Sequence, residues 1–265
     1  MLLEKEKPLL NKIIVTTRQH SPNDPLILKL TELGAKAFAF PTIKTEIHAD
    51  ENLFIKTIST FDDYHSTIFT SANAVKYFFE LLNQKKLNPN LQSKLFCVIG
   101  DSTEKTLKAH IKNPTLIKPK EACAESILEL YKSLILNKNE KILYIRPKTT
   151  RELLCKGFAK IYLSLDELVV YKTIFNCDES LKQKLENMLK NNQVNLVTFT
   201  SPSTFNNFMK IFPECLLKKA KGLKIASIGA VTKNAIEQKG LIVDIVPDIF
   251  NIDSLLEAIL LYYSK

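Results

Sequence analysis

The sequence contains two copies of one pattern, offset from each other by almost half its length. The run that leads to Ser71 is repeated before Ser201, 130 residues later, and the run around Gly100 is repeated around Gly229, 129 residues later. The opening apolar run, residues 13–17, matches a later run at an offset of 128 residues. Three matches at nearly one offset indicate two copies of one architecture. We therefore expect two halves of one site where the repeated strands meet helices.

Short apolar runs bounded by polar residues alternate along the chain with segments of helical periodicity. The apolar runs predict strands at residues 13–17, 35–40, 67–70, 95–99, 115–117, 141–145, 160–163, 196–199, 224–228 and 242–246. We expect helices after Asp24, Ser71, Ser102, Glu121, Ser201, Ala230 and Asp253, and a surface helix within residues 174–195. Alternation of this kind predicts an α/β fold in which helices cover parallel sheets.

Two extended stretches, residues 40–46 and 167–173, leave a strand without an obvious helix after them and lie at matching points of the repeat. If each stretch carries the chain between domains, they cross as a pair of linker strands. The middle segment, 43–170, then forms one α/β domain, and residues 1–42 plus 174–265 form a second, discontinuous one. A chain of 265 residues is long enough for two such domains, each with its own core.

The ends of two repeated strands lead straight into amphipathic helices at Ser71 and Ser201. Serine is a favoured N-cap residue, and Pro202 suits the first helical position. A helix N-terminus at the carboxyl end of a parallel strand presents free N–H groups and a positive dipole, which bind carboxylate or phosphate. Ser71, Ala72, Ser201 and Ser203 are therefore candidate binding residues. Simple capping is the alternative interpretation for any one of these helices.

A second repeated pair consists of Gly100 with Thr103 and Gly229 with Thr232. Glycine lets the backbone approach a ligand closely, and the threonine can offer its hydroxyl in the first helical turn. Neither GxGxxG nor GxxxxGK followed by Ser or Thr is present, so nothing indicates a nucleotide or flavin cofactor.

Two arginines, Arg18 and Arg146, end equivalent strands of the repeat. An arginine in this place can form a bidentate pair with a carboxylate of a ligand. A solvated loop is the alternative interpretation for each of them.

The chain is basic, with 37 Lys and Arg residues against 28 Asp and Glu and a formal net charge of +9. The excess is spread over both halves, which suits a polyanionic ligand held between them. A generally lysine-rich protein is the plainer explanation. Nucleic acid is a further alternative, although no recognition motif or dense basic stripe supports it.

Composition also limits the compartment and the kind of site. Five scattered cysteines without CxxC and four histidines without metal-ligand spacing predict reduced thiols and no metal site. The sequence has neither a signal-peptide pattern nor an apolar run of about 20 residues. We therefore expect a cytoplasmic protein that contacts no membrane.

The order of these motifs resembles that of the uroporphyrinogen-III synthase family over residues 12–262. The resemblance is carried by the opening strand with Arg18 and by residues 69–75, 99–103, 169–173, 199–203 and 228–233. It implies two flavodoxin-like parallel-sheet domains joined by a two-stranded antiparallel linker, and no cofactor or metal. It also implies a linear tetrapyrrole substrate, hydroxymethylbilane, whose eight carboxylates match the expected polyanion. The implied reaction forms uroporphyrinogen III and water with inversion of ring D, through a spiro intermediate.

The resemblance assigns Tyr171 to the family's tyrosine and implies that it donates a proton to the leaving oxygen. A phenol with a pKa of about 10 is protonated at neutral pH. Packing of the ring against a domain is the alternative. Tyr171 also breaks the repeat, because Ile43 stands at the equivalent position of the first copy.

Two other functions stay open at this point. The main alternative is a two-domain cytoplasmic binding protein for a polyanionic small molecule, and the other is a nucleic-acid-binding module. For the enzyme, the expected partners are the tetrapyrrole substrate and, transiently, the preceding enzyme of the pathway, with no nucleic acid and no membrane.

Overall fold

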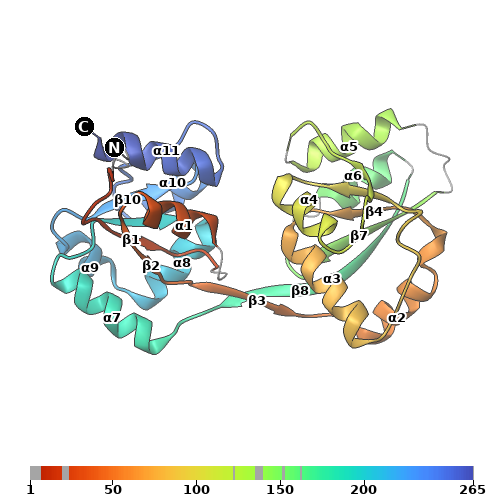
Figure 1. Ribbon diagram of the computed structural model, residues 1–265, viewed down its shortest axis with the longest axis horizontal. Coiled ribbons are helices and arrows are strands. Elements are labelled where there is room, and N and C mark those ends of the chain that lie inside the picture. The colour runs from red at the N-terminus through yellow and green to blue at the C-terminus, as the bar shows by residue number, and fades with distance from the viewer. Residues whose placement is uncertain are drawn as a thin grey trace, which may run out of the picture. The chain divides into compact units, whose positions relative to one another are not determined.

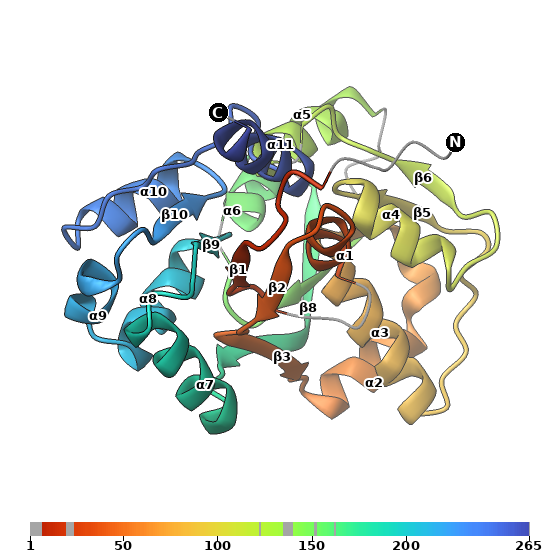
Figure 2. The ribbon, with the colours of Figure 1, turned by 60° about the vertical axis from the view of Figure 1, so that its left-hand side comes forward.

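The computed structural model describes residues 7–19, 24–121, 123–134, 140–150, 153–161 and 163–264, which form a mixed α/β fold with parallel sheets. The chain divides into two compact units (Figure 1). Unit 1 consists of residues 1–44 and 174–265, and unit 2 of residues 45–173. Two strands, β3 (Ile43–Ile47) and β8 (Ser164–Phe175), run across this boundary and are neighbours in one sheet, as Figures 1 and 2 show.

Unit 1 contains a four-stranded parallel sheet in the order β10-β9-β1-β2. Its strands are β1 (Ile13–Thr16), β2 (Lys36–Ala39), β9 (Leu196–Phe199) and β10 (Lys224–Ser227). Its helices are α1 (Pro25–Glu32), α7 (Glu179–Lys190), α8 (Pro202–Ile211), α9 (Glu214–Lys219), α10 (Ala230–Glu237) and α11 (Ile252–Tyr263). The helix expected within residues 174–195 is therefore α7.

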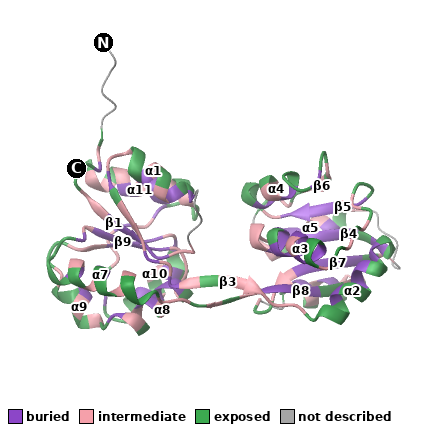
Figure 3. Ribbon diagram, turned by 60° about the horizontal axis from the view of Figure 1, so that its bottom comes forward, coloured by how far each residue is buried: buried purple, intermediate pink, exposed green. Residues whose placement is uncertain are grey.

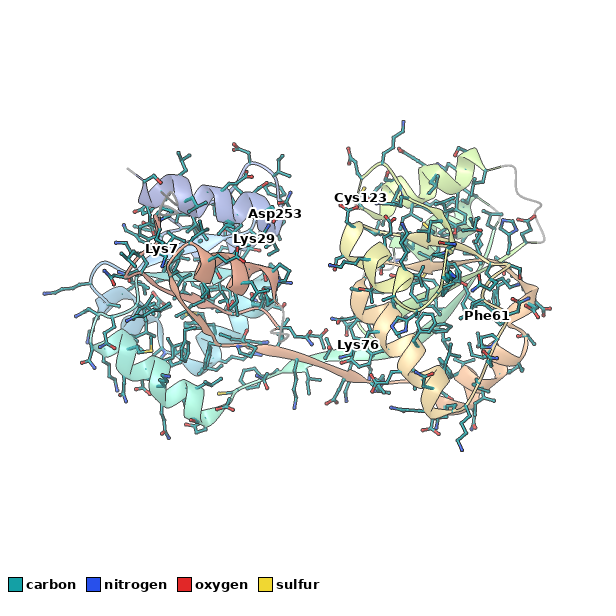
Figure 4. All side chains as sticks on the ribbon, viewed as in Figure 1. Lys7, Lys29, Phe61, Lys76, Cys123 and Asp253 are labelled. Carbon is teal, nitrogen blue, oxygen red and sulfur yellow. The ribbon has the colours of Figure 1, made fainter. Side chains whose placement is uncertain are left out.

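Helices cover both faces of the unit 1 sheet because its strands are apolar on both sides. Val15 faces a core formed with α7, α8, α9 and α10, whereas its neighbour Ile14 faces α1 and α11. Alternate residues of a strand point to opposite faces, so each face needs its own helical layer. An ion pair at 2.5 Å between Lys29 and Asp253 joins α1 to α11, and both residues are labelled in Figure 4.

Unit 2 contributes most of a six-stranded sheet in the order β3-β8-β7-β4-β5-β6. Its other strands are β4 (Tyr64–Phe69), β5 (Leu95–Val98), β6 (Thr115–Ile117) and β7 (Lys141–Pro147). Its helices are α2 (Glu51–Ser59), η1 (Phe61–Asp63), α3 (Ala72–Gln84), α4 (Asp101–Lys108), α5 (Ala124–Ser133) and α6 (Leu153–Lys160). All of the pairs from β8 to β6 are parallel.

The unit 2 sheet also has a core on each face. Phe69 packs toward α2, α3 and α4, in a cluster that includes Phe78 and Tyr171. Its neighbour Ile68 packs toward α5 and α6 with Tyr131 and Tyr144. Figure 3 shows that the central strands are buried, which is expected for a parallel sheet with helices on both faces.

Two strand predictions are wrong, and local hydrogen bonds explain both. Among the described residues of 160–163 there is no strand: Lys160 ends α6, and the carbonyl of Phe158 accepts hydrogen bonds from the N–H groups of Ile161 and Leu163. Residues 242–246 form only an isolated bridge. There the Asp244 carboxylate accepts a hydrogen bond from the Ile225 N–H at 2.9 Å and replaces one contact of a regular ladder.

Candidate active site

Most of the predicted site residues lie at or beyond the carboxyl ends of adjacent parallel strands in each unit. In unit 1, Gly229, Ser201 and Arg18 follow the neighbouring strands β10, β9 and β1. In unit 2, Gly100 and Ser71 follow β5 and β4, and Arg146 lies near the end of β7. Ligands of open α/β sheets bind at this edge. The repeated sequence thus produces the same arrangement in both sheets.

Ser71 caps α3 and also contacts Tyr171. Its Oγ accepts a hydrogen bond from the Ala74 N–H at 3.1 Å and lies 3.1 Å from the Tyr171 hydroxyl. Ala72, the other candidate residue of this junction, is the first residue of α3. Burial is the main cause that raises the pKa of the Tyr171 phenol above its ordinary value. Ser71 and Tyr171, which the sequence indicated separately, are therefore in contact.

A change of register in β8 gives Tyr171 this orientation. Arg146 of β7 is paired with Val169, but the next residue of β7 is paired with Tyr171, so that Val170 is an extra residue in β8. In a regular strand the neighbours Val170 and Tyr171 would point to opposite faces. Because of the register change, both side chains belong to the core cluster that includes α3. Bulges that redirect a side chain are frequent beside active sites.

A cavity of about 480 Å³ lies at the carboxyl ends of β4, β5 and β7. It is lined by Thr70, Ile99, Cys123, Ala124, Glu125, Ile127, Tyr144, Thr150, Leu153 and Leu154. The hydroxyls of Thr70 and Tyr144 lie 3.3 Å apart on its wall. Cys123, labelled in Figure 4, precedes α5. The cavity offers apolar surface beside a few hydroxyl groups, as small-molecule sites commonly do.

A second hollow, of about 530 Å³, shares Thr150 with the first. Its lining consists of Arg146, Lys148, Thr149, Thr150, Cys155, Lys156 and Glu167. Three basic groups against one carboxylate leave this hollow positive, which favours an anionic ligand. Arg146 is already engaged, because its Nε lies 2.6 Å from Glu167 Oε1 and its Nη1 donates to the carbonyls of Pro147 and Lys148.

Gly100 is the N-cap residue of α4 and has a backbone conformation that glycine adopts more easily than other residues. Its φ is +76°, and a Cβ added to it would meet nothing within 4 Å, so conformation rather than crowding explains the residue. Thr103 lies in the first turn of α4, as predicted, but is only 3% exposed. Most of its side chain is therefore covered by unit 2 itself.

In unit 1, Ser201 forms a capping box at the start of α8. Its Oγ accepts a hydrogen bond from the Thr204 N–H at 3.2 Å, while its own N–H donates to Thr204 Oγ1. Ser203 is exposed and its Oγ lies 2.9 Å from that of Ser201. The two hydroxyls and the first N–H groups of α8 thus lie together.

The remaining candidates of unit 1 have partners within the unit. A Cβ added to Gly229 would lie 2.9 Å from the ring of Phe250, so packing of this exposed ring explains the glycine. Thr232 is buried in the first turn of α10. Arg18 lies 3.5 Å from the carboxylate of Asp24, which caps α1.

Tyr77, Tyr144 and the cavity were not predicted from the sequence. Tyr77 stacks on Tyr171 with ring centroids 5.3 Å apart, and Tyr144 lines the cavity. Both tyrosines occupy apolar positions of a helix or strand, where sequence periodicity indicates core packing. The available signal was the presence of a tyrosine in each of β7, β8 and α3.

Among the described residues, no group of three or more His, Cys, Asp or Glu side chains could hold a metal ion. No helix within the same part of the chain has the length and apolar character needed to cross a membrane.

The parallel sheets, the helix N-termini at their carboxyl ends and the basic hollow define an α/β protein with a candidate site for an anionic small molecule. The sequence model of the family described as uroporphyrinogen-III synthase HemD matches residues 24–257. The chain belongs to this family, whose members are enzymes of haem biosynthesis.

Individual relatives agree with this assignment. A uroporphyrinogen-III synthase of Chlorobaculum parvum is 28% identical over 252 residues, which cover 94% of this chain and 98% of that protein. That of Synechococcus elongatus is 26% identical and covers 96% of each. The crystal structure of uroporphyrinogen-III synthetase from Helicobacter pylori 26695 is similar in fold, with a TM-score of 0.60 and 18% identity over 95% of this chain and 99% of that one.

Proposed function

We propose that this chain cyclises hydroxymethylbilane to uroporphyrinogen III and that Tyr171 donates the proton to the leaving oxygen. The family supports the overall reaction. The role of Tyr171 is supported by one contact: its hydroxyl lies 3.1 Å from the Oγ of Ser71. Ser71 stands between the carboxyl end of β4 and the start of α3. A binding protein for a polyanion, the alternative from the sequence, is not favoured by any of the relatives described above.

The surroundings of Tyr171 support a donor that keeps its proton at neutral pH. Burial raises the pKa of the phenol, because the low-dielectric surroundings disfavour the phenolate. A hydrogen bond from Ser71 acts in the other direction and lowers that pKa. Tyr171 is therefore protonated before the reaction, while Ser71 stabilises the phenolate that proton transfer creates.

The direction of the hydrogen bond between the two hydroxyls matters for this role. Ser71 Oγ already accepts from the Ala74 N–H, which leaves its own proton free to donate to Tyr171. The phenolic proton of Tyr171, a residue that is 6% exposed, is then left for the substrate. We propose this direction in the reactive complex.

Tyr171 gives a proton and takes one back in the step that loses water. The bond between the ring A methylene carbon and the hydroxyl oxygen breaks, and the oxygen takes the electron pair and the Tyr171 proton and leaves as water. The lone pair of the ring A nitrogen forms the azafulvene, and the phenolate takes back the proton that this nitrogen loses. The substituted carbon of ring D then attacks the ring A methylene carbon, and the electron pair of the azafulvene double bond returns to ring A. In the spiro intermediate the bond from that ring D carbon to the ring C methylene breaks. This methylene rebonds to the free α-carbon of ring D, which gives up its proton while the ring A nitrogen regains one, and ring D is thereby inverted.

We propose that main-chain donors at helix N-termini bind the substrate carboxylates. Ser71, Ala72 and Gly100 serve in unit 2, and Ser201, Ser203 and Gly229 in unit 1. The buried residues Thr103 and Thr232 shape the first turns of α4 and α10 instead of offering much surface to the ligand. Arg18 and Arg146 also bind carboxylates of the substrate. These carboxylates replace or join the acidic partners that the two arginines now have, Asp24 and Glu167.

The same proposal covers the organisation of the protein. The two compact units are taken as flavodoxin-like domains, joined by β3 and β8 as a two-stranded antiparallel linker; the neighbouring positions of these strands support this. The enzyme acts in the cytoplasm and receives its unstable substrate by transient contact with the preceding enzyme of the pathway.

An isomer assay tests the reaction. The protein is incubated with hydroxymethylbilane, and the porphyrins are separated after oxidation. Isomer III supports the proposal, whereas isomer I alone, the product of spontaneous closure, would overturn it. The role of Tyr171 is tested with Tyr171→Phe, which should lower kcat for isomer III by about 10²- to 10⁴-fold with KM nearly unchanged.

A further inference from the structure

The ring of Tyr171 lies against the ring of Tyr77. Their centroids are 5.3 Å apart and their planes differ by 22°. Tyr77 lies on α3, the helix that begins after Ser71, and follows Lys76, which is labelled in Figure 4. One helix therefore provides both the hydroxyl partner and the ring partner of Tyr171.

Tyr77 is itself held firmly. It is 5% exposed, and its hydroxyl donates to the Thr45 carbonyl at 2.7 Å. A tyrosine has one hydroxyl proton, so the Thr45 hydroxyl, at 2.8 Å, donates to Tyr77 in turn. The exposed Lys76 places its Nζ 5.2 Å from the centroid of the Tyr77 ring.

A single hydroxyl contact does not fix a phenol for proton transfer. The bond to Ser71 sets the distance of the Tyr171 oxygen, but rotation about the side-chain bonds can still swing the ring and redirect its proton. Contact with the face of a second, fixed ring restricts that rotation. General acids need such support, because a small displacement of the proton lowers the rate strongly.

We infer that Tyr77 is a positioning residue for Tyr171 that keeps the phenol aimed at the reacting oxygen. This inference rests on the proposed role of Tyr171 as proton donor. Tyr77 touches no reacting atom in this scheme. It acts through the stacked rings, and Thr45 of β3 anchors it from a strand adjacent to β8.

A double-mutant cycle with Tyr77→Leu and Tyr171→Phe tests this role. Tyr77→Leu should lower kcat for isomer III by about tenfold to hundredfold with KM within about twofold of the wild type. In the Tyr171→Phe background the same change should alter kcat by less than about twofold, because no phenolic proton is left to position. Tyr77→Phe, which keeps the ring and loses both Thr45 bonds, should recover most of the rate.

Tyr131 provides a matched control in the same unit. It lies on α5 and is also buried, its hydroxyl lies 2.8 Å from Ser66 Oγ, and its ring packs on Phe158 of α6. Tyr131→Leu and Tyr131→Phe should lower the unfolding midpoint as the Tyr77 variants do and leave kcat unchanged. If Tyr77→Leu does not fold, the cycle with Tyr77→Phe decides, with a reduction of about threefold expected only when Tyr171 is present.

The outcomes separate the two proposals. If Tyr171→Phe is slow and the Tyr77 change acts by the same factor in both backgrounds, or not at all, the role of Tyr77 is refuted while that of Tyr171 stands. If Tyr171→Phe turns over like the wild type, Tyr171 is not the donor and both roles fail together.

Discussion

The hydroxyls of Tyr171 and Ser71 lie 3.1 Å apart, although 100 residues separate them in the sequence. β7 lies between β8 and β4 in the sheet, so the two residues do not come from neighbouring strands. The extra residue Val170 and the start of α3 after β4 bring the phenol to the helix cap. A cap residue thereby acquires a partner with acid–base chemistry.

Ser71→Ala should reduce both stability and turnover. Loss of the N-cap hydrogen bond should lower the free energy of unfolding by about 1 kcal/mol. Loss of the hydrogen bond that stabilises the Tyr171 phenolate should lower kcat by about tenfold. Urea unfolding and the isomer III assay measure the two effects.

Asp50 supplies the control for this variant, because its carboxylate caps α2 of the same unit by accepting from the Leu53 N–H at 2.9 Å. Asp50→Ala should cost a similar free energy of unfolding and leave kcat unchanged. Equal kcat values for Ser71→Ala and Asp50→Ala would show that Ser71 is only a cap.

The pH dependence of kcat should report the ionisation of the Tyr171 phenol. A proton donor works in its protonated form, so activity should persist below the pKa of Tyr171 and fall as pH rises through it. Burial raises that pKa, which places the fall above the ordinary titration range of a tyrosine. Because the Ser71 hydrogen bond lowers the pKa, Ser71→Ala should move the fall to higher pH. A fall below about pH 9 that persists in Tyr171→Phe would assign it to another group.

Much of this site follows from local sequence, and the remainder does not. Ser71 and Ser201 were identified as caps because capping depends on a residue and the few that follow it. The stacking of Tyr77 on Tyr171 depends on how α3 packs over β8, which periodicity does not report. The register change at Val170 was also hidden, because alternation along 164–175 gives no sign of an extra residue.

The fold shows the same division between local and distant causes. Asp24, Pro25 and Gly34 predict the limits of α1, and the helix begins at Pro25 and ends two residues before Gly34, whose φ is +95°. The apolar run at 242–246 predicts a strand, but the side chain of Asp244 bonds to the backbone of a neighbouring strand and limits the pairing. A sequence pattern therefore indicates that a segment can be a strand, whereas the pairing with a neighbouring strand decides whether that strand forms.

The buried thiol of Cys97 should make unfolding easier at alkaline pH. Burial raises its pKa to about 12 in the folded protein, whereas an unfolded thiol ionises near pH 8.5. Its contribution to stability is therefore fully present below about pH 8.5 and is lost as pH rises toward about 12. Cys97→Ala should be less stable at pH 7, through loss of packing, but should lose less stability over this window.

Urea midpoints measured at a series of pH values check this expectation. Cys215→Ala, which removes an exposed thiol, is the control and should follow the wild type. Parallel curves for the wild type and Cys97→Ala would contradict the assigned origin of the alkaline destabilisation.

The effect of Gly157→Ala on the free energy of unfolding should change sign when the neighbouring Leu128 is replaced by alanine. An added Cβ would overlap the side chain of Leu128, where α5 and α6 pack together. Gly157→Ala should therefore destabilise the protein by about 1–3 kcal/mol, although alanine is the better helix former. In the Leu128→Ala background the overlap is gone, and the same change should stabilise by about 1 kcal/mol. Urea unfolding of the four proteins tests this, and destabilisation in both backgrounds would contradict it.

The insertion of unit 2 into unit 1 has a consequence for protein synthesis. Strands β1 and β2 leave the ribosome before unit 2, but β1 must pair with β9, which is translated only after all of unit 2. Unit 2 is continuous in the sequence, so its whole sheet is available while half of the other sheet has not been made. β1 must therefore wait for β9, and the order in which the two sheets fold differs from the order in which their strands are translated.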